Sequence, residues 1–235
     1  GKNSINFSST LGTSAPPNLH NLRSMNAAEY IDFEKELFDN NFFYDPTSGW
    51  RAPNRSDAIM TMFRAKRGEI SLDEESSILS QLGQMDNRQQ IRDQLLQAAQ
   101  SQQYNLSFNG AVQGARYYAS AVYSKDRPIY RENNANNMSL TFNIENSYFN
   151  NKLKVSLGLN HIIQKSKVNG AAIRAISPGT FGLTPYNLLL DENGSSISRY
   201  FAFTPQVAQE RFESQGYLPW SYNHMDELSL SNGPH

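Results

Sequence analysis

The stretch from Asn137 to Gln164, NMSLTFNIENSYFNNKLKVSLGLNHIIQ, alternates apolar and polar residues on both sides of Asn150-Asn151. Before that pair, large apolar residues occupy every second position except that of Asn146: Leu140, Phe142, Ile144 and Tyr148. After it, the same alternation continues: Leu153, Val155, Leu157 and Leu159. Strict period two is typical of a β-strand whose two faces meet different environments, so the sequence predicts a long β-hairpin here.

Two kinds of protein use strands of this type. A strand of about 10 residues tilted by about 45° crosses the hydrocarbon core of a bilayer as part of a β-barrel. A soluble β-sandwich shows the same alternation, because one face of each strand meets the core and the other meets water. The hairpin alone therefore leaves both alternatives open.

The composition excludes several other classes. The 235 residues carry 21 Lys and Arg against 22 Asp and Glu, and a net charge of -1 gives no electrostatic argument for nucleic-acid binding. The mean hydropathy of -0.61 and the absence of any apolar run of about 20 residues argue against a helical membrane protein. Cysteine is absent, so neither a disulfide framework nor a cysteine metal site is available.

Five segments of the chain have the alternation of a strand. They lie near residues 3–12, 103–111, 116–124, 138–149 and 152–164. Gln113-Gly114 marks a tight turn between the second and third segments, as Asn150-Asn151 does between the last two. We therefore expect antiparallel strands joined by short turns at these two points.

Two long segments, residues 13–102 and 165–235, lie outside these strands and contain helical patterns. Each predicted helix has a start signal: Asn26 before residues 27–40, Ser56 before 57–66, Ser71 with Glu74 before Ile78 to Leu82, Asp86 or Asn87 before a helix that reaches Ala99, and Thr204-Pro205 before Val207 to Phe212. We expect the apolar residues of the first segment to form a small core of their own.

The lengths of the connections distinguish the two alternatives. After the first strand they run long, short, medium-long, short and long. Bacterial outer-membrane barrels have short turns on the periplasmic side and longer loops outside, whereas a sandwich has no reason to sort its loops in this way. The sequence therefore predicts an all-β fold of antiparallel strands from an outer-membrane β-barrel, with long helix-containing extracellular loops.

Several phrases, taken in chain order, form a further pattern: Leu22 to Tyr30 (LRSMNAAEY), Gln103 to Gly110 (QYNLSFNG), Tyr117 to Ser120 (YYAS), Arg131 to Asn137, and Leu218 to Glu227 (LPWSYNHMDE). Together they resemble the SusC/RagA family of TonB-linked outer-membrane transporters over nearly the whole chain. The opening Gly1-Lys2 is similar to the point just past the family's plug domain. Arg127 and Pro128 stand where the family pattern has a glycine near Asp126, which leaves the alignment of that loop open.

The resemblance implies part of a TonB-dependent transporter in the outer membrane of Gram-negative Bacteroidetes, which imports oligosaccharides or peptides in a SusC/SusD-like uptake system. About five of the roughly 22 strands of such a barrel would lie in this chain, with the plug domain and the remaining strands outside it. The implied partners are a SusD-like surface lipoprotein, outer-membrane lipid, and the TonB complex through a part of the protein not present here. The alternative is a secreted or periplasmic carbohydrate-binding module with a β-sandwich core. Neither is an enzyme, and neither needs a cofactor.

No catalytic, cofactor or metal site is predicted. Residues considered as metal ligands lack partners at a suitable spacing: His20, His161, His224 and His235. Asp191, Asn193 and Gly194 are too short a series for a calcium loop, and Asp226-Glu227 has no nucleophile beside it. Aromatic rings on the long loops can stack on a sugar or peptide or can pack the loops themselves: Trp50, Tyr186, Tyr217, Trp220 and Tyr222.

Overall fold

The computed structural model describes residues 3–48, 55–112, 114–177, 182–200, 205–219 and 221–230. The chain divides into two compact units. A strand unit comprises Gly1–Pro16 and Gln97–Asn169, and a helical unit comprises Pro17–Leu96 and Gly170–His235.

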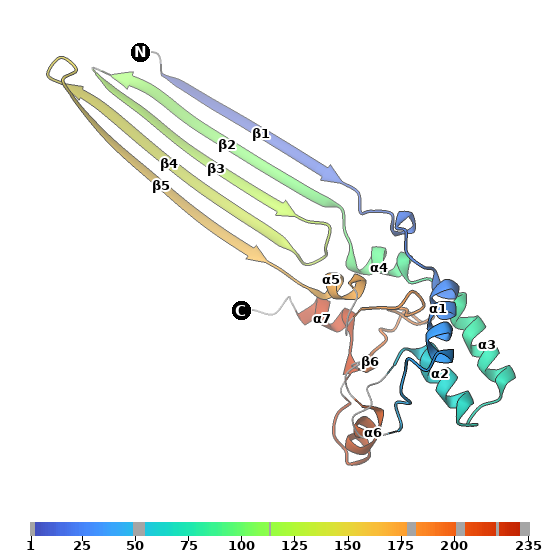
Figure 1. Cartoon of the computed structure of the whole chain (residues 1–235). Helices are drawn as coiled ribbons and strands as arrows, with labels where there is room; N and C mark the ends of the chain where they lie inside the picture. The colour runs from blue at the N-terminus through green and yellow to red at the C-terminus, as the bar shows by residue number, and fades with distance from the viewer. Residues whose placement is uncertain are drawn as a thin grey trace. The chain divides into compact units, whose positions relative to one another are not determined.

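The strand unit is a single antiparallel sheet in which neighbours along the chain are neighbours in the sheet, as Figure 1 shows. Its five strands are β1 (Ser4–Ser14), β2 (Ala99–Val112), β3 (Ala115–Arg127), β4 (Asn134–Tyr148) and β5 (Leu153–Lys167). The antiparallel strands and helix-containing insertions predicted from the sequence are confirmed, and the described residues form an open sheet rather than a closed barrel. Several strands extend past the alternating segments, β3 for example through Lys125, Asp126 and Arg127.

Both predicted tight turns lie at the same end of the sheet. Phe149, Asn150 and Asn151 all have positive φ angles, of 53°, 54° and 67°. Asparagine tolerates this left-handed backbone better than most residues do, which explains why the turn forms at the Asn-Asn pair. At the other turn, Gly114 has a φ of 88°, while Gln113 lies outside the described residues.

The helix predicted to reach Ala99 ends earlier, so that part of the prediction is wrong. It is α4 (Arg88–Leu95), and Leu96 already has an extended backbone. The backbone N–H of Gln97 donates to the carbonyl of Ile129 at 2.8 Å, and Ala99 pairs with Ser14 as the first residue of β2. Pairing with a strand distant in sequence therefore overrides the helical pattern of this segment.

The helical unit contains the helices that local capping signals predicted, together with elements that they did not. The predicted ones are α1 (Ala27–Asp39), α2 (Asp57–Lys66), α3 (Leu72–Gly83) and α6 (Gln206–Ser214), besides α4. Asn26 and Glu29 form a full capping box, and Ser56 and Ser71 each accept a backbone hydrogen bond as N-caps. The unpredicted ones are a 3-10 helix (Leu19–Asn21), α5 (Ala171–Ile176), α7 (His224–Leu230), and a pair of short strands, β6 (Arg199–Tyr200) and β7 (Ser221–Tyr222). No helix in the described part of the chain is both long and apolar enough to span a membrane.

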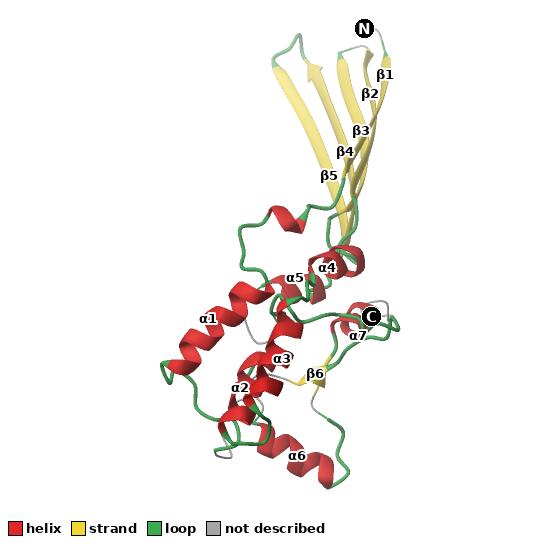
Figure 2. Ribbon diagram, turned by 90° about the vertical axis from the view of Figure 1, so that its right-hand side faces the viewer, coloured by secondary structure: helices red, strands yellow, loops and turns green. Residues whose placement is uncertain are grey.

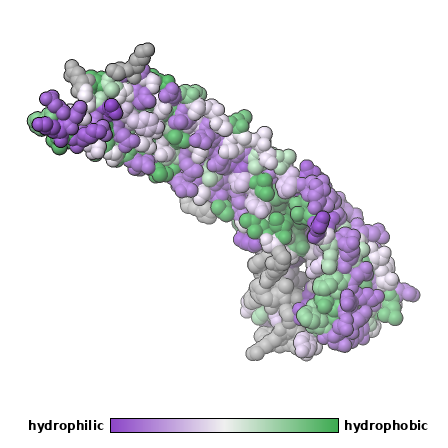
Figure 3. Space-filling model, turned by 45° about the horizontal axis from the view of Figure 1, so that its top comes forward, coloured by the Kyte–Doolittle hydropathy of each residue, from purple (hydrophilic) through white to green (hydrophobic). Residues whose placement is uncertain are grey.

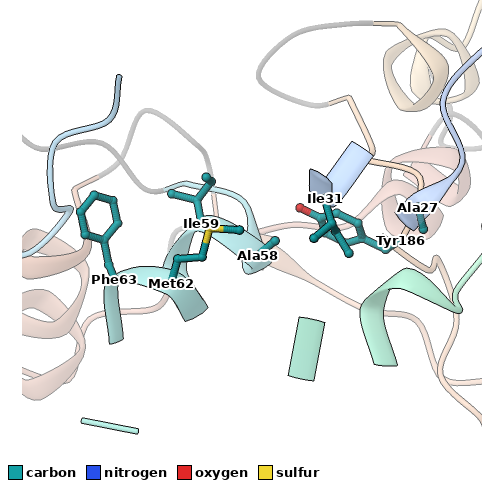
Figure 4. Close-up of a cluster of buried hydrophobic side chains, with 7 residues drawn as sticks. All are labelled: Ala27, Ile31, Ala58, Ile59, Met62, Phe63 and Tyr186. Carbon is teal, nitrogen blue, oxygen red and sulfur yellow. The ribbon is translucent and has the colours of Figure 1, made fainter. Parts of the chain in front are cut away.

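The helical unit has a hydrophobic core of its own. α1, α2 and α3 contact one another pairwise and are grouped in Figure 2. Their buried cluster is drawn in Figure 4: Ala27, Ile31, Ala58, Ile59, Met62, Phe63 and Tyr186. Tyr186 comes from the second insertion, and its ring lies beside Ile31 of α1 in the figure. The two insertions therefore share one core.

Truncation of this core should destabilise the helical unit. Ile59 is 1% exposed, so Ile59→Ala should lower the free energy of unfolding by about 3 kcal/mol, because it removes buried methyl groups and leaves a cavity. Leu72→Ala, at a residue 76% exposed, should change it by about 0.5 kcal/mol or less. Denaturant unfolding followed by circular dichroism measures both. Equal effects of the two substitutions would show that Ile59 is not part of a packed core.

Candidate functional site

The four strand pairings place most of the large apolar side chains on the same side of the sheet, which we call the apolar face. A row across this face runs through residues that lie directly opposite one another on neighbouring strands: Ile5, Phe108, Ala119, Phe142 and Leu159. These side chains are not covered, since Leu159 is 62% exposed and Ile5 is 69% exposed. Hydrophobic residues are accordingly visible at the surface of the strand unit in Figure 3, among hydrophilic ones.

The opposite side, which we call the polar face, has a different chemistry. One of its rows contains only polar residues: Asn6, Ser107, Ser120, Thr141 and Asn160. The hydroxyl groups of Ser139 and Thr141 both lie 3.5 Å from the Oδ1 atom of Asn160, to which they donate. This face also contains three larger apolar residues, Tyr118, Val122 and Ile162, but none of them lies opposite another on a neighbouring strand. The sheet is therefore apolar on one side and wettable on the other.

The large apolar residues of the apolar face form a band of limited height along the strands, which we call the apolar band. It runs on β4 from Met138 to Tyr148, which at about 3.4 Å per residue is roughly 34 Å along the strand. A tilt of about 45° reduces this to roughly 24 Å, close to the apolar height of about 25 Å in outer-membrane barrels. Tyrosines lie at both limits, with Tyr104 opposite Tyr123 at one and Tyr148 at the other.

In the helical unit a buried carboxyl group meets a buried phenol. The hydroxyl of Tyr186 donates to Oε2 of Glu34 at 2.8 Å, and the two residues are 1% and 5% exposed. Burial raises the pKa of Glu34, although hydrogen bonds from Ser56 and Tyr186 act in the opposite direction. Burial, together with the nearby Glu34 charge, also raises the pKa of Tyr186. The raised pKa of each group favours its protonated, uncharged form.

A cavity of about 840 Å³ lies beside this pair within the helical unit. Its walls include Glu34, Asp57, Arg55 and Arg199, and the Nε atoms of both arginines are buried with no hydrogen-bond partner among the residues that the structure describes. Burial lowers the pKa of Arg199, while the Asp57 charge opposes that shift. Acidic residues outnumber the arginines along the described walls, because Glu210 and Glu213 also line the cavity.

The aromatic residues considered as ligand contacts lie in different environments where the structure describes them. Tyr186 is part of the core and cannot meet a ligand at the surface. Tyr217 is 63% exposed and packs edge-on against Phe212, while Tyr222 lines the cavity with its ring against that of His224. Trp50 and Trp220 lie outside the described residues. Among the described residues, the structure therefore does not bring Tyr186, Tyr217 and Tyr222 together into one site.

The histidines are scattered over both units. His20 lies 3.6 Å from Asp86, His161 is on the apolar face, His224 is buried, and His235 lies outside the described residues. Among the residues that the structure describes, no group of three or more His, Cys, Asp or Glu side chains could hold a metal ion.

The acidic candidates are used in local structure. The Oδ1 atom of Asp191 accepts hydrogen bonds from the backbone N–H groups of Asn193 and Ser195, at 2.9 and 2.8 Å, so this carboxylate closes an ordinary turn. Glu227 pairs with Arg174 at 3.0 Å, and the adjacent Asp226 lies in the first turn of α7.

Sequence reasoning did not single out Glu34. A signal was present, because Glu34 stands among apolar residues at helical spacing, with Tyr30 and Ile31 before it and Phe38 after it. A carboxylate on the apolar stripe of a helix requires a buried partner. That partner, Tyr186, lies 152 residues away and could not be identified from the local sequence.

Comparison with family models finds no match, and comparison with curated proteins finds none either. Among solved structures, the chain is similar to that of the RagAB peptide importer in its closed-closed state, with 21% identity and a TM-score of 0.47 over 86% of this chain. A second structure, of the RagAB peptide transporter, gives 22% identity and a TM-score of 0.49 over 85% of this chain. The chain spans 22% of the length of each of these proteins.

The Glu34–Tyr186 pair makes stability depend on pH in a specific direction. A carboxyl group whose pKa is raised on folding adds stability at low pH, and this is lost as the pH rises through the raised pKa. Glu34→Gln keeps an acceptor for Tyr186 but cannot ionise. Its melting temperature should therefore gain on that of the wild type as the pH rises above the ordinary value of 4.5. Glu36→Gln, on the exposed side of α1, is the control. Identical pH profiles for the two variants would contradict an ionisable, buried Glu34.

Proposed function

We propose that this chain is part of a TonB-dependent transporter of the outer membrane, with SusC-like organisation, that imports oligosaccharides or peptides. The apolar face would contact lipid and the polar face would line the barrel lumen. A SusD-like lipoprotein would be the partner at the cell surface, and the TonB complex would act through a part of the protein outside this chain.

The observation that carries the proposal is the location of the buried hydrophobic residues. Every one that the structure identifies lies in the helical unit, from Leu19 to Leu96 or from Ala171 to Ala208. The strands expose large side chains instead, such as Phe7 at 67% and Leu157 at 63%. An aqueous domain would have to bury such a surface, whereas a lipid-facing sheet requires it.

The connections support an orientation in the membrane. The turns near Gly114 and Asn150 leave from one end of the sheet, and the two insertions leave from the other. Short turns are periplasmic and long loops extracellular in outer-membrane barrels. The helical unit would then be extracellular. Its closed core and polar surface suit an environment of water.

The edges of the sheet support the presence of further strands. Within the described residues β1 and β5 each pair on one side only. An unpaired backbone group costs several kcal/mol in hydrocarbon, so a sheet in lipid must close on itself. Strands outside this chain would complete the barrel by pairing with β1 and β5.

The sandwich alternative receives less support from the geometry. A sandwich needs a second sheet about 10 Å from the first. The other sheet among the described residues consists of β6 and β7, each of two residues, and belongs to the helical unit. A carbohydrate-binding module with a sandwich core would require a covering layer that these strands do not form.

Membrane fractionation tests the proposal directly. The full-length protein that contains this chain should sediment with the outer membrane and resist extraction by salt or alkali, because its apolar band is held by lipid. Recovery as a freely soluble monomer would contradict the proposal and favour the binding-module alternative.

A charge scan tests which face meets lipid. Leu157→Arg places a cation near the middle of the apolar face and should cost about 2–4 kcal/mol, seen as a lower yield of folded protein in the outer membrane. Ser156→Arg, one residue earlier, lies on the polar face opposite Glu145 and should be tolerated. Equal losses for the two variants would contradict the assignment of the faces.

A further inference from the structure

The apolar face carries charged residues at one end only. The charged residues are Lys125, Arg127, Lys165 and Lys167, and they lie at the end of the sheet from which the insertions leave. Lys125 is opposite Asn136, and Asn136 is opposite Lys165, so these two lysines share a row. Among the described strands, this face holds no Asp or Glu; Asp126 and Glu145 are on the polar face.

The basic residues begin where the apolar band ends. Tyr123 lies opposite Met138, and Met138 lies opposite Ile163, forming the last apolar row. Lys125 is two residues further on, which is about 7 Å along the strand. Long basic side chains at such a depth lay their methylene groups on apolar surface and extend their charge to the headgroup level.

Three of these cations have no partner within the described chain. Lys167 is paired with Glu132 at 3.2 Å. Beyond the backbone pairing of their strands, Lys125, Arg127 and Lys165 make no side-chain hydrogen bond or ion pair with any other described residue. Arg127 and Lys165 are exposed and Lys125 is half-buried. Their charges are therefore available to an external anion.

A hollow in the apolar face lies next to the row that contains Tyr104 and Tyr123. Ala119 and Ala121 of β3 are flanked by Phe108 and Leu106 on one side and by Phe142 and Leu140 on the other. The small side chains between large ones leave a cavity of about 310 Å³ on this face. Along β3 the face thus runs from the alanine hollow through Tyr123 to Lys125 and Arg127.

We propose that this surface is a binding site for a lipid with an anionic phosphate headgroup. An acyl chain lies in the hollow over Ala119 and Ala121, and the phosphate is held among Lys125, Arg127 and Lys165. The inference rests on the proposed function, which places a bilayer against the apolar face and the basic end in its outer leaflet. A zwitterionic lipid matches the hollow but not the net positive charge, and a free phosphate matches the charge but not the hollow.

The test measures lipid affinity of the full-length protein in detergent. Phosphatidylglycerol and phosphatidylcholine with the same acyl chains are titrated separately, and the rise in melting temperature gives an apparent affinity for each. Phosphatidylglycerol should bind more tightly than phosphatidylcholine, and its advantage should fall with added salt. Inorganic phosphate alone should produce no comparable rise.

Variants separate the headgroup from the acyl chain. Each basic residue near an anionic headgroup is worth about a fivefold change in affinity, so Lys125→Gln/Arg127→Gln/Lys165→Gln should weaken phosphatidylglycerol binding on the order of 100-fold. The matched control Arg116→Gln/Lys152→Gln/Lys154→Gln removes the same number of charges near the opposite end of the sheet and should leave the preference intact. Ala121→Phe fills the hollow and should weaken both lipids. If the triple variant does not fold, Lys165→Gln alone should still show the fivefold loss.

The outcomes distinguish this inference from the function on which it rests. Equal affinity for the two lipids, or equal losses in the triple variant and its control, would overturn the lipid site while leaving the outer-membrane location untouched. A stoichiometric protein that co-purifies on the apolar face in place of lipid would overturn it as well. Absence of the protein from the outer-membrane fraction would instead contradict the proposed function itself.

Discussion

The register of the four strand pairings is the constraint on which the strand unit depends. Because side chains alternate between faces, a shift of one residue in any pairing would move a whole strand's apolar set to the polar face. Short turns fix the register of β2 with β3 and of β4 with β5. β1 has no such turn, since a long insertion separates it from β2, and its register is set by matching faces, as where Phe7 lies opposite Leu106.

Features that depend on a few consecutive residues could be predicted from the sequence, whereas features that join distant segments could not. The alternation of β4 and β5, the turn at Asn150 and the N-cap at Asn26 are all local. The early end of α4 follows from a strand pairing, and the role of Glu34 follows from a tyrosine in the other insertion. The last residues of β3, Lys125 to Arg127, lack the alternation of a strand and are held in it by pairing with the start of β2.

The helical unit buries its large apolar side chains, whereas the strand unit leaves its own exposed. The helical unit buries Ile59, Met62 and Tyr186 and is closed on itself. The strand unit is held mainly by backbone hydrogen bonds between strands, and its apolar side chains stabilise it only when something apolar lies against them. A mean hydropathy of -0.61 is therefore compatible with a membrane protein, because the polar face and the insertions offset a single apolar face.

If the sheet lies in a bilayer, as proposed, its charged residues locate it there more finely than its hydrophobic residues do. The polar face carries both signs, and Lys154 and Glu145 pair there at 3.4 Å, as expected for side chains that stay in water. The apolar face has no Lys, Arg, Asp or Glu across its band, as a lipid-facing surface would require, since a cation at a bilayer midplane costs about 2–4 kcal/mol. Its basic residues are confined to the rows beyond Tyr123 and begin with Lys125, as expected where headgroups and water would replace hydrocarbon. If this face lies against a bilayer, as proposed, the boundary between those rows marks the depth at which hydrocarbon gives way to headgroups, and the positive charge beyond it favours anionic ones.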